Sequence, residues 1–290
     1  MKEKARYDEE RGNYTKWEMY RLLEGEDLGP FHLPVTEALS LDAVRGMLAR
    51  FSSVFLKPVD TWGGRSVGML QEVEGRLIWR LQGAEAQEVE LESVVAAYDG
   101  IDAIVQEAAP VVFFQGRPFD IRTHLQRDPD GGGWVYAGEL VRVGGGVGVV
   151  SNVEISGGQV MTLEEMVREV FGEAGTESDS GGICAESLRE ELEDGSLAVC
   201  ELLEHVPHFV EIGFDVCLDA DGGLWLIEVN ANDALGGPSH ELFAKLPDQT
   251  LYEQMMERYH ARQRGFLELL FGAMEMTVDG EFEEETDEEH

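Results

Sequence analysis

Two strand-like segments joined by a polar turn constrain the fold of this chain more than any other feature. Residues 214–218 and 224–229 are rich in β-branched and aromatic side chains, and residues 219–223 (DADGG) between them are typical of a turn. The pattern predicts a β-hairpin. Because strand side chains alternate between faces, Glu228 and Asn230 point the same way, and Asp215 faces them from the partner strand.

Three oxygen-bearing side chains in this arrangement suit magnesium, which prefers carboxylate and amide oxygens and completes its shell with water and phosphate. The alternative is a hairpin whose polar residues only line a solvated rim. Glu228 argues against that alternative, because a carboxylate within the otherwise apolar strand LWLIEVN is costly to desolvate without a cation.

A lysine and a glycine-bearing loop form the second informative segment. Lys57 ends the predicted strand at residues 54–57 and precedes the loop DTWGGRSVG at 60–68. Glycine lets backbone N–H groups approach phosphate oxygens closely, and lysine supplies a point charge. The spacing fits neither a Walker A loop nor a Rossmann loop. An ordinary strand end followed by a turn is the alternative.

Two arginines are predicted on neighbouring strands. Asp120 and Arg122 share a face of the segment GRPFDIRTHL, and Arg142 ends the next predicted strand. Arginines beside a magnesium site favour recognition of a phosphate, or of a carboxylate that is being phosphorylated. The alternative for Asp120 with Arg122 is a surface cross-strand salt bridge. His124 could act as a base, but a strand residue facing the other layer is favoured.

The order of predicted elements indicates an α+β fold with antiparallel sheets and no internal repeat. Strands are expected at 54–57, 69–73, 76–82, 104–107, 119–127, 133–143 and 147–152, in addition to the hairpin. Helices are expected at 14–24, 41–51, 91–98, 162–171, 185–204 and 250–273.

Charge and composition exclude several classes of function. The 290 residues carry 22 basic and 58 acidic side chains, a net charge of −36, which disfavours nucleic acid and anionic membranes as partners. We find no apolar run of about 18 residues and no signal-like N-terminus. The three cysteines lack the spacing of a zinc site, so we expect reduced thiols in a cytoplasmic protein.

Read in order, the motifs carry a resemblance that runs from about Lys16 to Phe243. They are NYTKWEMYRLL, VFLKPVDTWGGRSVG, IVQE, GRPFDIR, LVRVG, SNVEISGG and VEIGFDVCLDADGGLWLIEVN. The sequence resembles ATP-grasp proteins, and more narrowly the YheC/YheD family of endospore coat-associated proteins. The resemblance implies an ATP-grasp fold, in which two α+β subdomains clamp ATP between antiparallel sheets.

That resemblance also implies domain bounds and ligands. Residues 1–15 would form a polar extension, 16–275 the ATP-grasp domain with a lid subdomain at about 52–107, and 276–290 an acidic tail. The implied ATP-contacting residues are Lys16, Lys57, the lid glycines Gly63, Gly64 and Gly68, the adenine hinge Gln106, Glu107 and Ala108, and Asn152. Arg122 and Arg142 would face the γ-phosphate and an acyl phosphate. Asp215, Glu228 and Asn230 would bind Mg²⁺, with Mn²⁺ as a substitute.

The expected function is an ATP- and Mg²⁺-dependent carboxylate–amine ligase that forms an acyl phosphate from a small-molecule or peptide carboxylate. Only residues 1–15 precede Lys16, so a third, substrate-binding subdomain is expected to be missing or supplied by a partner protein. The residues after Asn230 (Ala231, Asn232, Asp233) depart from the family pattern on the acceptor side. The alternatives are an ATP-binding structural or spore-coat-associated protein with little turnover, and a kinase of small acids.

Overall fold

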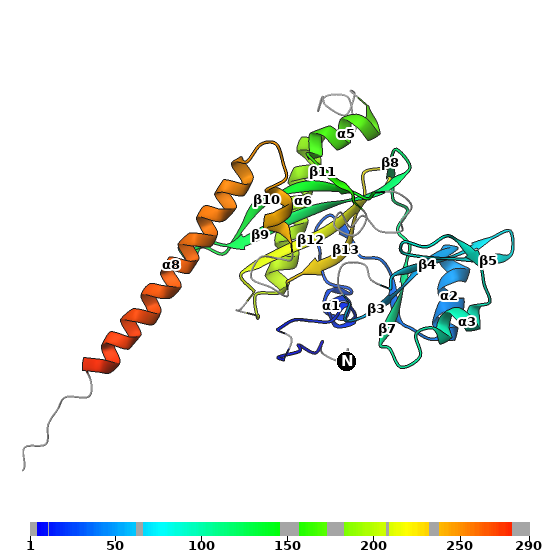
Figure 1. The fold of residues 1–290 in the computed structure, drawn as a ribbon, viewed down its shortest axis with the longest axis horizontal. Coiled ribbons are helices and arrows are strands. Elements are labelled where there is room, and N and C mark those ends of the chain that lie inside the picture. The colour runs from blue at the N-terminus through cyan, green and yellow to red at the C-terminus, as the bar shows by residue number, and fades with distance from the viewer. Residues whose placement is uncertain are drawn as a thin grey trace, which may run out of the picture.

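The structure is a computed structural model that describes residues 5–10, 12–61, 66–145, 157–172, 183–206, 209–231 and 238–279, with side chains as far as residue 271. The predicted strand at 147–152, the residues Gly63, Gly64 and Asn152, and most of the acidic tail lie outside this range. Two sheets with their helices form the body of the molecule, and one long helix extends away from it (Figure 1).

The smaller body is a six-stranded antiparallel sheet covered by two helices. Its order is β2 (Thr36–Ala38), β7 (Ala103–Glu107), β3 (Ser53–Pro58), β4 (Gly68–Val73), β5 (Arg76–Leu81) and β6 (Gln87–Glu88). Helices α2 (Leu41–Phe51) and α3 (Leu91–Ala96) pack on it through a buried cluster that includes Val44, Met47 and Val94. The Ser40 side chain caps α2 by accepting a hydrogen bond from the Ala43 N–H. The predicted bounds of the lid subdomain, about 52–107, stay a prediction.

The larger body is a seven-stranded sheet. Its order is β1 (Phe31–His32), β13 (Leu224–Asn230), β12 (Glu211–Leu218), β9 (Arg117–Arg127), β10 (Trp134–Val143) and β11 (Gln159–Met161), with β8 (Phe113–Phe114) paired to β9. The β12–β13 pair is antiparallel, which confirms the predicted hairpin. The two-residue strands β1, β6 and β8 were not predicted.

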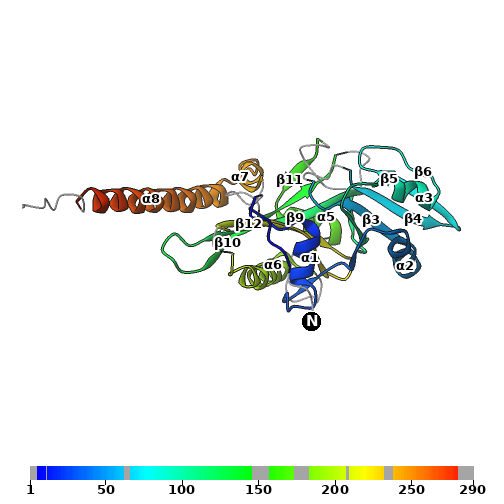
Figure 2. The ribbon, with the colours of Figure 1, turned by 90° about the horizontal axis from the view of Figure 1, so that it is seen from below.

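Helices cover both faces of this larger sheet (Figure 2). Helices α1 (Lys16–Leu23), α5 (Leu163–Phe171) and α6 (Ala185–Leu202) contribute to the main core on one face. Helices α7 (Ser239–Phe243) and α8 (Thr250–Asp279) lie on the other face, where Leu242, Phe243 and Met255 pack against Leu140. Strand β9 therefore turns apolar residues to α6 and polar residues to α7.

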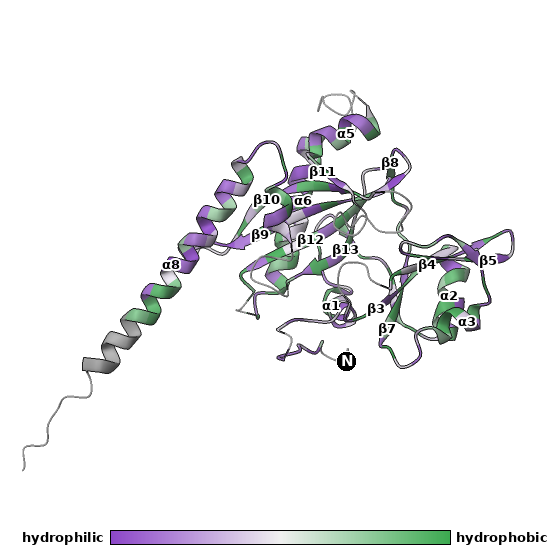
Figure 3. Cartoon of the chain, in the orientation of Figure 1, coloured by the Kyte–Doolittle hydropathy of each residue, from purple (hydrophilic) through white to green (hydrophobic). Residues whose placement is uncertain are grey.

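Away from the sheet, α8 changes character. Its colour passes from largely hydrophilic near the sheet to hydrophobic further out (Figure 3), where Phe266, Leu269 and Phe271 are 63%, 76% and 59% exposed. Within the described residues, a search for helices that combine the length and the apolarity needed to cross a membrane found none.

Other expectations can be compared directly with the structure. Tyr14 is buried in the main core and contacts the ring of Tyr7, so the polar N-terminal segment packs on the body from at least residue 7. Cys184, Cys200 and Cys217 are all described, and none of the three forms a disulfide with another. The predicted bounds of the extension, the ATP-grasp domain and the tail stay predictions.

Replacing Gly68 by alanine is expected to lower the free energy of unfolding by about 1–3 kcal/mol. A Cβ at this position would lie 2.1 Å from Cη2 of Trp79, whose ring crosses the first residue of β4. The measurement is urea denaturation. Gly46→Ala is the matched control, because a Cβ there has no neighbour within 4 Å and alanine favours the helix. Equal midpoints for Gly68→Ala and wild type would contradict the packing explanation.

Candidate functional site

The hairpin brings the three predicted metal ligands together on one face. Asp215 on β12 is the direct cross-strand partner of Glu228 on β13, and Asn230 lies two residues further along the same strand. Asp215 and Asn230 are buried, while the Glu228 side chain is 29% exposed. The structure therefore agrees with the arrangement expected from strand alternation.

Two buried arginines compensate the charge of Asp215. Its Oδ1 accepts a hydrogen bond from Arg122 Nε at 2.6 Å and lies 2.8 Å from Arg142 Nη2. Arg142 also makes a bidentate pair with Asp120, at 2.7 and 2.6 Å. Burial opposes ionisation of Asp215, but the two guanidinium groups outweigh it and lower its pKa. The alternative of a surface pair between Asp120 and Arg122 is wrong, because both side chains are buried and Asp120 pairs with Arg142 across the sheet.

Two lysines approach the same site from α1 and from the smaller sheet. Lys16 Nζ lies 3.0 Å from Glu228 Oε1 and donates to the Thr61 carbonyl at 2.5 Å, which links α1 to the start of the glycine loop. Lys57 Nζ donates to Gln106 Oε1 at 2.5 Å. Burial lowers the pKa of Lys57 to about 8, although Glu228 acts in the opposite direction.

The predicted adenine-hinge residues lie at the end of β7. The Gln106 side chain bridges Lys57 and Thr36, donating to Thr36 Oγ1 at 3.0 Å. The Glu107 carboxylate accepts the Val35 N–H at 3.0 Å. The N–H of Ala108 donates to Ser53 at 3.3 Å. The Gln106 and Glu107 side chains therefore both make hydrogen bonds within the protein. Adenine recognition by backbone groups stays a prediction.

Seven charged side chains of the site carry a positive excess. Lys16, Lys57, Arg122 and Arg142 are four cations, and they face three carboxylates, Asp120, Asp215 and Glu228. In a chain of net charge −36, a local sum of +1 favours an anionic ligand.

The donor set also fits magnesium. Two carboxylates and an amide share one face, and Asn230 Nδ2 is buried without a hydrogen-bond partner among the described residues. The unpaired Nδ2 is a donor and would bind an acceptor such as a phosphate oxygen, whereas Oδ1 is the atom of Asn230 that can bind a metal ion. Asp215, Glu228 and Asn230 are the residues that would hold the ion.

Most of the predicted site residues are thus gathered at one place, while Gly63, Gly64 and Asn152 lie outside the described residues. Sequence reasoning missed Ser239 in α7, whose Oγ accepts a hydrogen bond from Arg122 Nη1 at 3.3 Å. Its only signal in the sequence is a position shortly after Asn230. His124 shares the face of Arg122 but bonds to Glu211, at the end of β12 away from Asp215.

A comparison of the chain with family models establishes the family relationship that the motifs suggested. The YheC/D-like ATP-grasp family model matches residues 9–261, which is most of the chain. The chain belongs to this family. The two bodies, whose sheets are antiparallel apart from the short parallel β1–β13 pair, are accordingly the two α+β halves of an ATP-grasp fold, and the predicted fold and family are confirmed.

Within the YheC/D-like family, the chain is similar to the endospore coat-associated protein YheD of Bacillus subtilis (strain 168). The two are 23% identical over 239 residues, which cover 78% of this chain and 50% of YheD. The chain thus spans about half the length of this curated relative.

Three solved structures are also similar to the chain. The ADP complex of PurK, N5-carboxyaminoimidazole ribonucleotide synthetase, is 10% identical with a TM-score of 0.49, over 78% of this chain and 47% of that one. The ATP-grasp ligase PsnB with its minimal precursor is 14% identical with a TM-score of 0.47, over 85% and 61%. The D-cycloserine synthetase DcsG is 14% identical with a TM-score of 0.44, over 82% and 66%.

Proposed function

We propose that this chain is an ATP- and Mg²⁺-dependent ligase that joins a carboxylate to an amine through an acyl phosphate. The observation that carries the proposal is the buried array of Arg122, Arg142, Asp120 and Asp215 beside two lysines and Glu228. Its positive excess suits a polyphosphate, and its carboxylates suit the accompanying metal. Membership in an ATP-grasp family supports ATP as that polyphosphate.

In this proposal each part of the site has a separate task. Lys16 and Lys57 bind the inner phosphates, with Gly63, Gly64 and Gly68 in the covering loop and Asn152 as a further phosphate or substrate contact. Gln106, Glu107 and Ala108 lie along the adenine. Asp215, Glu228 and Asn230 hold Mg²⁺ or Mn²⁺, and the bound metal neutralises charge on the phosphates.

Arg122 and Arg142 have the central chemical role. Both guanidinium groups meet at Asp215 Oδ1, and in this proposal their positive charge holds the γ-phosphoryl group in line with a substrate carboxylate. The carboxylate oxygen takes the phosphoryl group as the bond to ADP breaks. The amine nitrogen then attacks the acyl carbon, loses a proton and displaces phosphate. These steps need no side-chain nucleophile.

A second candidate is an ATP-binding structural protein with little or no turnover. The name of YheD, an endospore coat-associated protein, favours it, and spore association is the corresponding location. A partner protein that contributes to the substrate side is compatible with both candidates. A kinase of small acids is the third candidate, because it would use the same phosphoryl transfer without an amine.

The test measures ADP release with mixtures of candidate acids and amines. ADP formation that requires both an acid and an amine supports the ligase. ADP formation with an acid alone and a stable phosphorylated product supports the kinase. If ATP binds with Mg²⁺, no mixture ever yields ADP and Glu228→Ala changes only binding, the ligase proposal fails and the structural protein is favoured.

Affinity for Mg²⁺-ATP is expected to fall as the pH rises above about 8. Lys57 has a pKa of about 8 in the free protein because it is buried, and only its protonated form attracts phosphate. In the limit, affinity falls about tenfold per pH unit. Isothermal titration calorimetry between pH 7 and 9.5 measures this fall. Lys57→Met is the control, with weaker binding and no such slope.

The lowered pKa of Lys57 has the opposite effect on folding stability, which rises with pH where nucleotide affinity falls. Below pH 8, Lys57 is protonated in the folded and the unfolded chain. Between about 8 and 10.5, the unfolded chain holds the proton and the folded chain does not, so the free energy of unfolding due to this group rises with pH.

An affinity for nucleotide that stays flat across this range in the wild type would contradict the role of Lys57.

A further inference from the structure

A further buried carboxylate lies on the same sheet face as Asp215, at the start of β12. Glu211 is the first residue of β12 and pairs in register with Gln126, whereas Asp215 pairs with Arg122. Glu211 and Asp215 are four positions apart along the strand, a spacing of roughly 13 Å. Glu211 is therefore too far from Asp215 to touch the same phosphate group.

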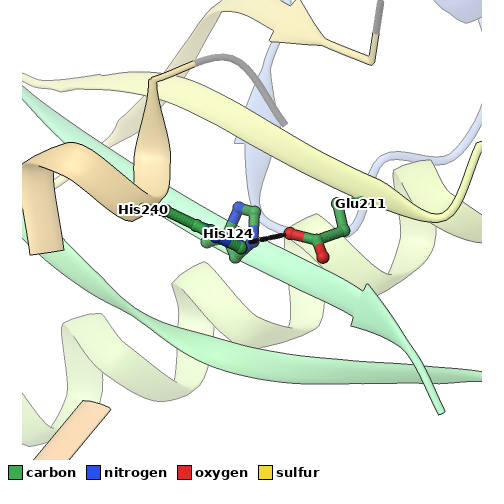
Figure 4. A group of neighbouring side chains, drawn as sticks. All are labelled: His124, Glu211 and His240. Carbon is green, nitrogen blue, oxygen red and sulfur yellow. Dashed lines mark hydrogen bonds and ion pairs between the residues drawn. The ribbon is translucent and has the colours of Figure 1, made fainter. Parts of the chain in front are cut away.

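Four donors surround Glu211. His124 Nε2 and His240 Nε2 lie 2.8 and 2.7 Å from Oε2 (Figure 4), and they come from β9 and α7. Gln126 Nε2 donates to Oε1 at 3.1 Å, and Arg262 of α8 donates to the same oxygen. Burial favours the neutral acid, but the hydrogen bonds from the two histidines lower the pKa of Glu211 to about 2.

His124, Glu211 and His240 offer three ligand atoms within 4.8 Å of one another, so a metal centre has to be considered. A histidine that binds a metal through Nε2 normally donates its other N–H to an acceptor. His124 Nδ1 is buried and has no partner in the part of the chain that the structure describes. Arg262 also places a cation on the same carboxylate. Burial lowers the pKa of His124, which favours the neutral ring. The contacts therefore fit a hydrogen-bonded anchor, in which Glu211 holds a neutral His124, better than they fit a metal centre.

The anchor is connected to the candidate site through α7. His240 follows Ser239, which is completely buried and accepts a hydrogen bond from Arg122 Nη1. Arg122 Nε in turn donates to Asp215. A five-residue helix such as α7 has little stability of its own, so tertiary contacts must fix its position.

We propose that Glu211 is a positioning residue for the candidate site: it holds α7 through His240, and the adjacent Ser239 then fixes the Arg122 guanidinium beside Asp215. This inference rests on the proposed function, in which Arg122 binds the γ-phosphate. A displaced Arg122 should weaken binding of a triphosphate and leave binding of a diphosphate unchanged. A purely structural anchor would not alter that preference.

The experiment measures binding of ADP and of the non-hydrolysable β,γ-imido analogue of ATP, both with Mg²⁺, by isothermal titration calorimetry. The Arg122→Met variant shows how much preference for the triphosphate over the diphosphate remains without the guanidinium. Ser239→Ala and Glu211→Gln are each expected to reduce the triphosphate preference about tenfold, the size of a lost hydrogen bond to a charged group. Ser239→Ala leaves the Glu211 contacts intact, so it tests the link even where Glu211→Gln fails to fold.

Glu204→Gln is the matched control. Its carboxylate also pairs with an arginine of β9, Arg127, at 2.6 Å, but it is 50% exposed and lies away from α7. The control should keep the wild-type preference.

Two results distinguish the inference from the function on which it rests. If Arg122→Met loses the preference while Ser239→Ala and a folded Glu211→Gln both keep it, the positioning role is overturned and the proposed function stands. If the wild type shows no preference, or Arg122→Met keeps it, the proposed role of Arg122 fails and the inference with it. Stoichiometric Zn²⁺ binding that His240→Gln abolishes would also overturn the inference.

Discussion

Replacing Arg142 by methionine is expected to lower the free energy of unfolding by about 3–5 kcal/mol, the usual cost of removing one partner from a buried ion pair. Arg142 bonds to both Asp120 and Asp215, and all three side chains are buried. The substitution leaves Asp120 without its bidentate partner and Asp215 with Arg122 alone. Urea denaturation followed by circular dichroism measures the loss.

Arg45→Met provides the control for this prediction. Arg45 pairs with Glu92 at 2.7 Å, but the two side chains are 53% and 61% exposed. Solvent screens such a pair, so its loss should cost less than about 1 kcal/mol. Similar small losses for both variants would show that the arginine–aspartate array contributes little to the fold.

Replacing Glu228 by glutamine is expected to reduce Mg²⁺-dependent ADP release by about 10²–10³-fold, as other losses of charge stabilisation in active sites do. The amide keeps the shape of the side chain but removes the negative charge that faces Lys16 and, in our proposal, the metal. The measurement is ADP release as a function of Mg²⁺ concentration, with Mg²⁺-ATP affinity as a second readout.

The exposed turn of the same hairpin supplies the control. Asp221→Asn removes a carboxylate between β12 and β13 without touching the site, so turnover should stay at the wild-type level. Full Mg²⁺-dependent turnover in Glu228→Gln would place the metal on other residues.

The hairpin could be predicted because its signal is local. Alternation along LWLIEVN fixes the shared face of Glu228 and Asn230, and the antiparallel partner strand follows after a short turn. The helix at residues 41–51 was predicted with its observed bounds, because Ser40 is a strong N-cap.

The partners of the charged residues could not be predicted in the same way. Asp120 and Arg122 share a face, and the alternative for them was a surface cross-strand salt bridge. A direct cross-strand neighbour is closer than a residue two positions along, so Asp120 pairs with Arg142 and Arg122 with Asp215. That outcome depends on β9 lying between β10 and β12. The contact between Glu211 and Arg262 depends similarly on where α8 packs.

The charge of the whole chain and the charge of the site have opposite effects on a nucleotide: the first opposes its approach, and the second stabilises the bound complex. Outside the site but within about a Debye length of the surface, an approaching nucleotide anion meets the field of a chain with net charge −36 and is repelled. Only within a few ångströms do Lys16, Lys57, Arg122 and Arg142 outweigh that field. Dissolved salt therefore accelerates the encounter by screening the repulsion and weakens the bound state by screening the attraction, so intermediate ionic strength favours occupancy.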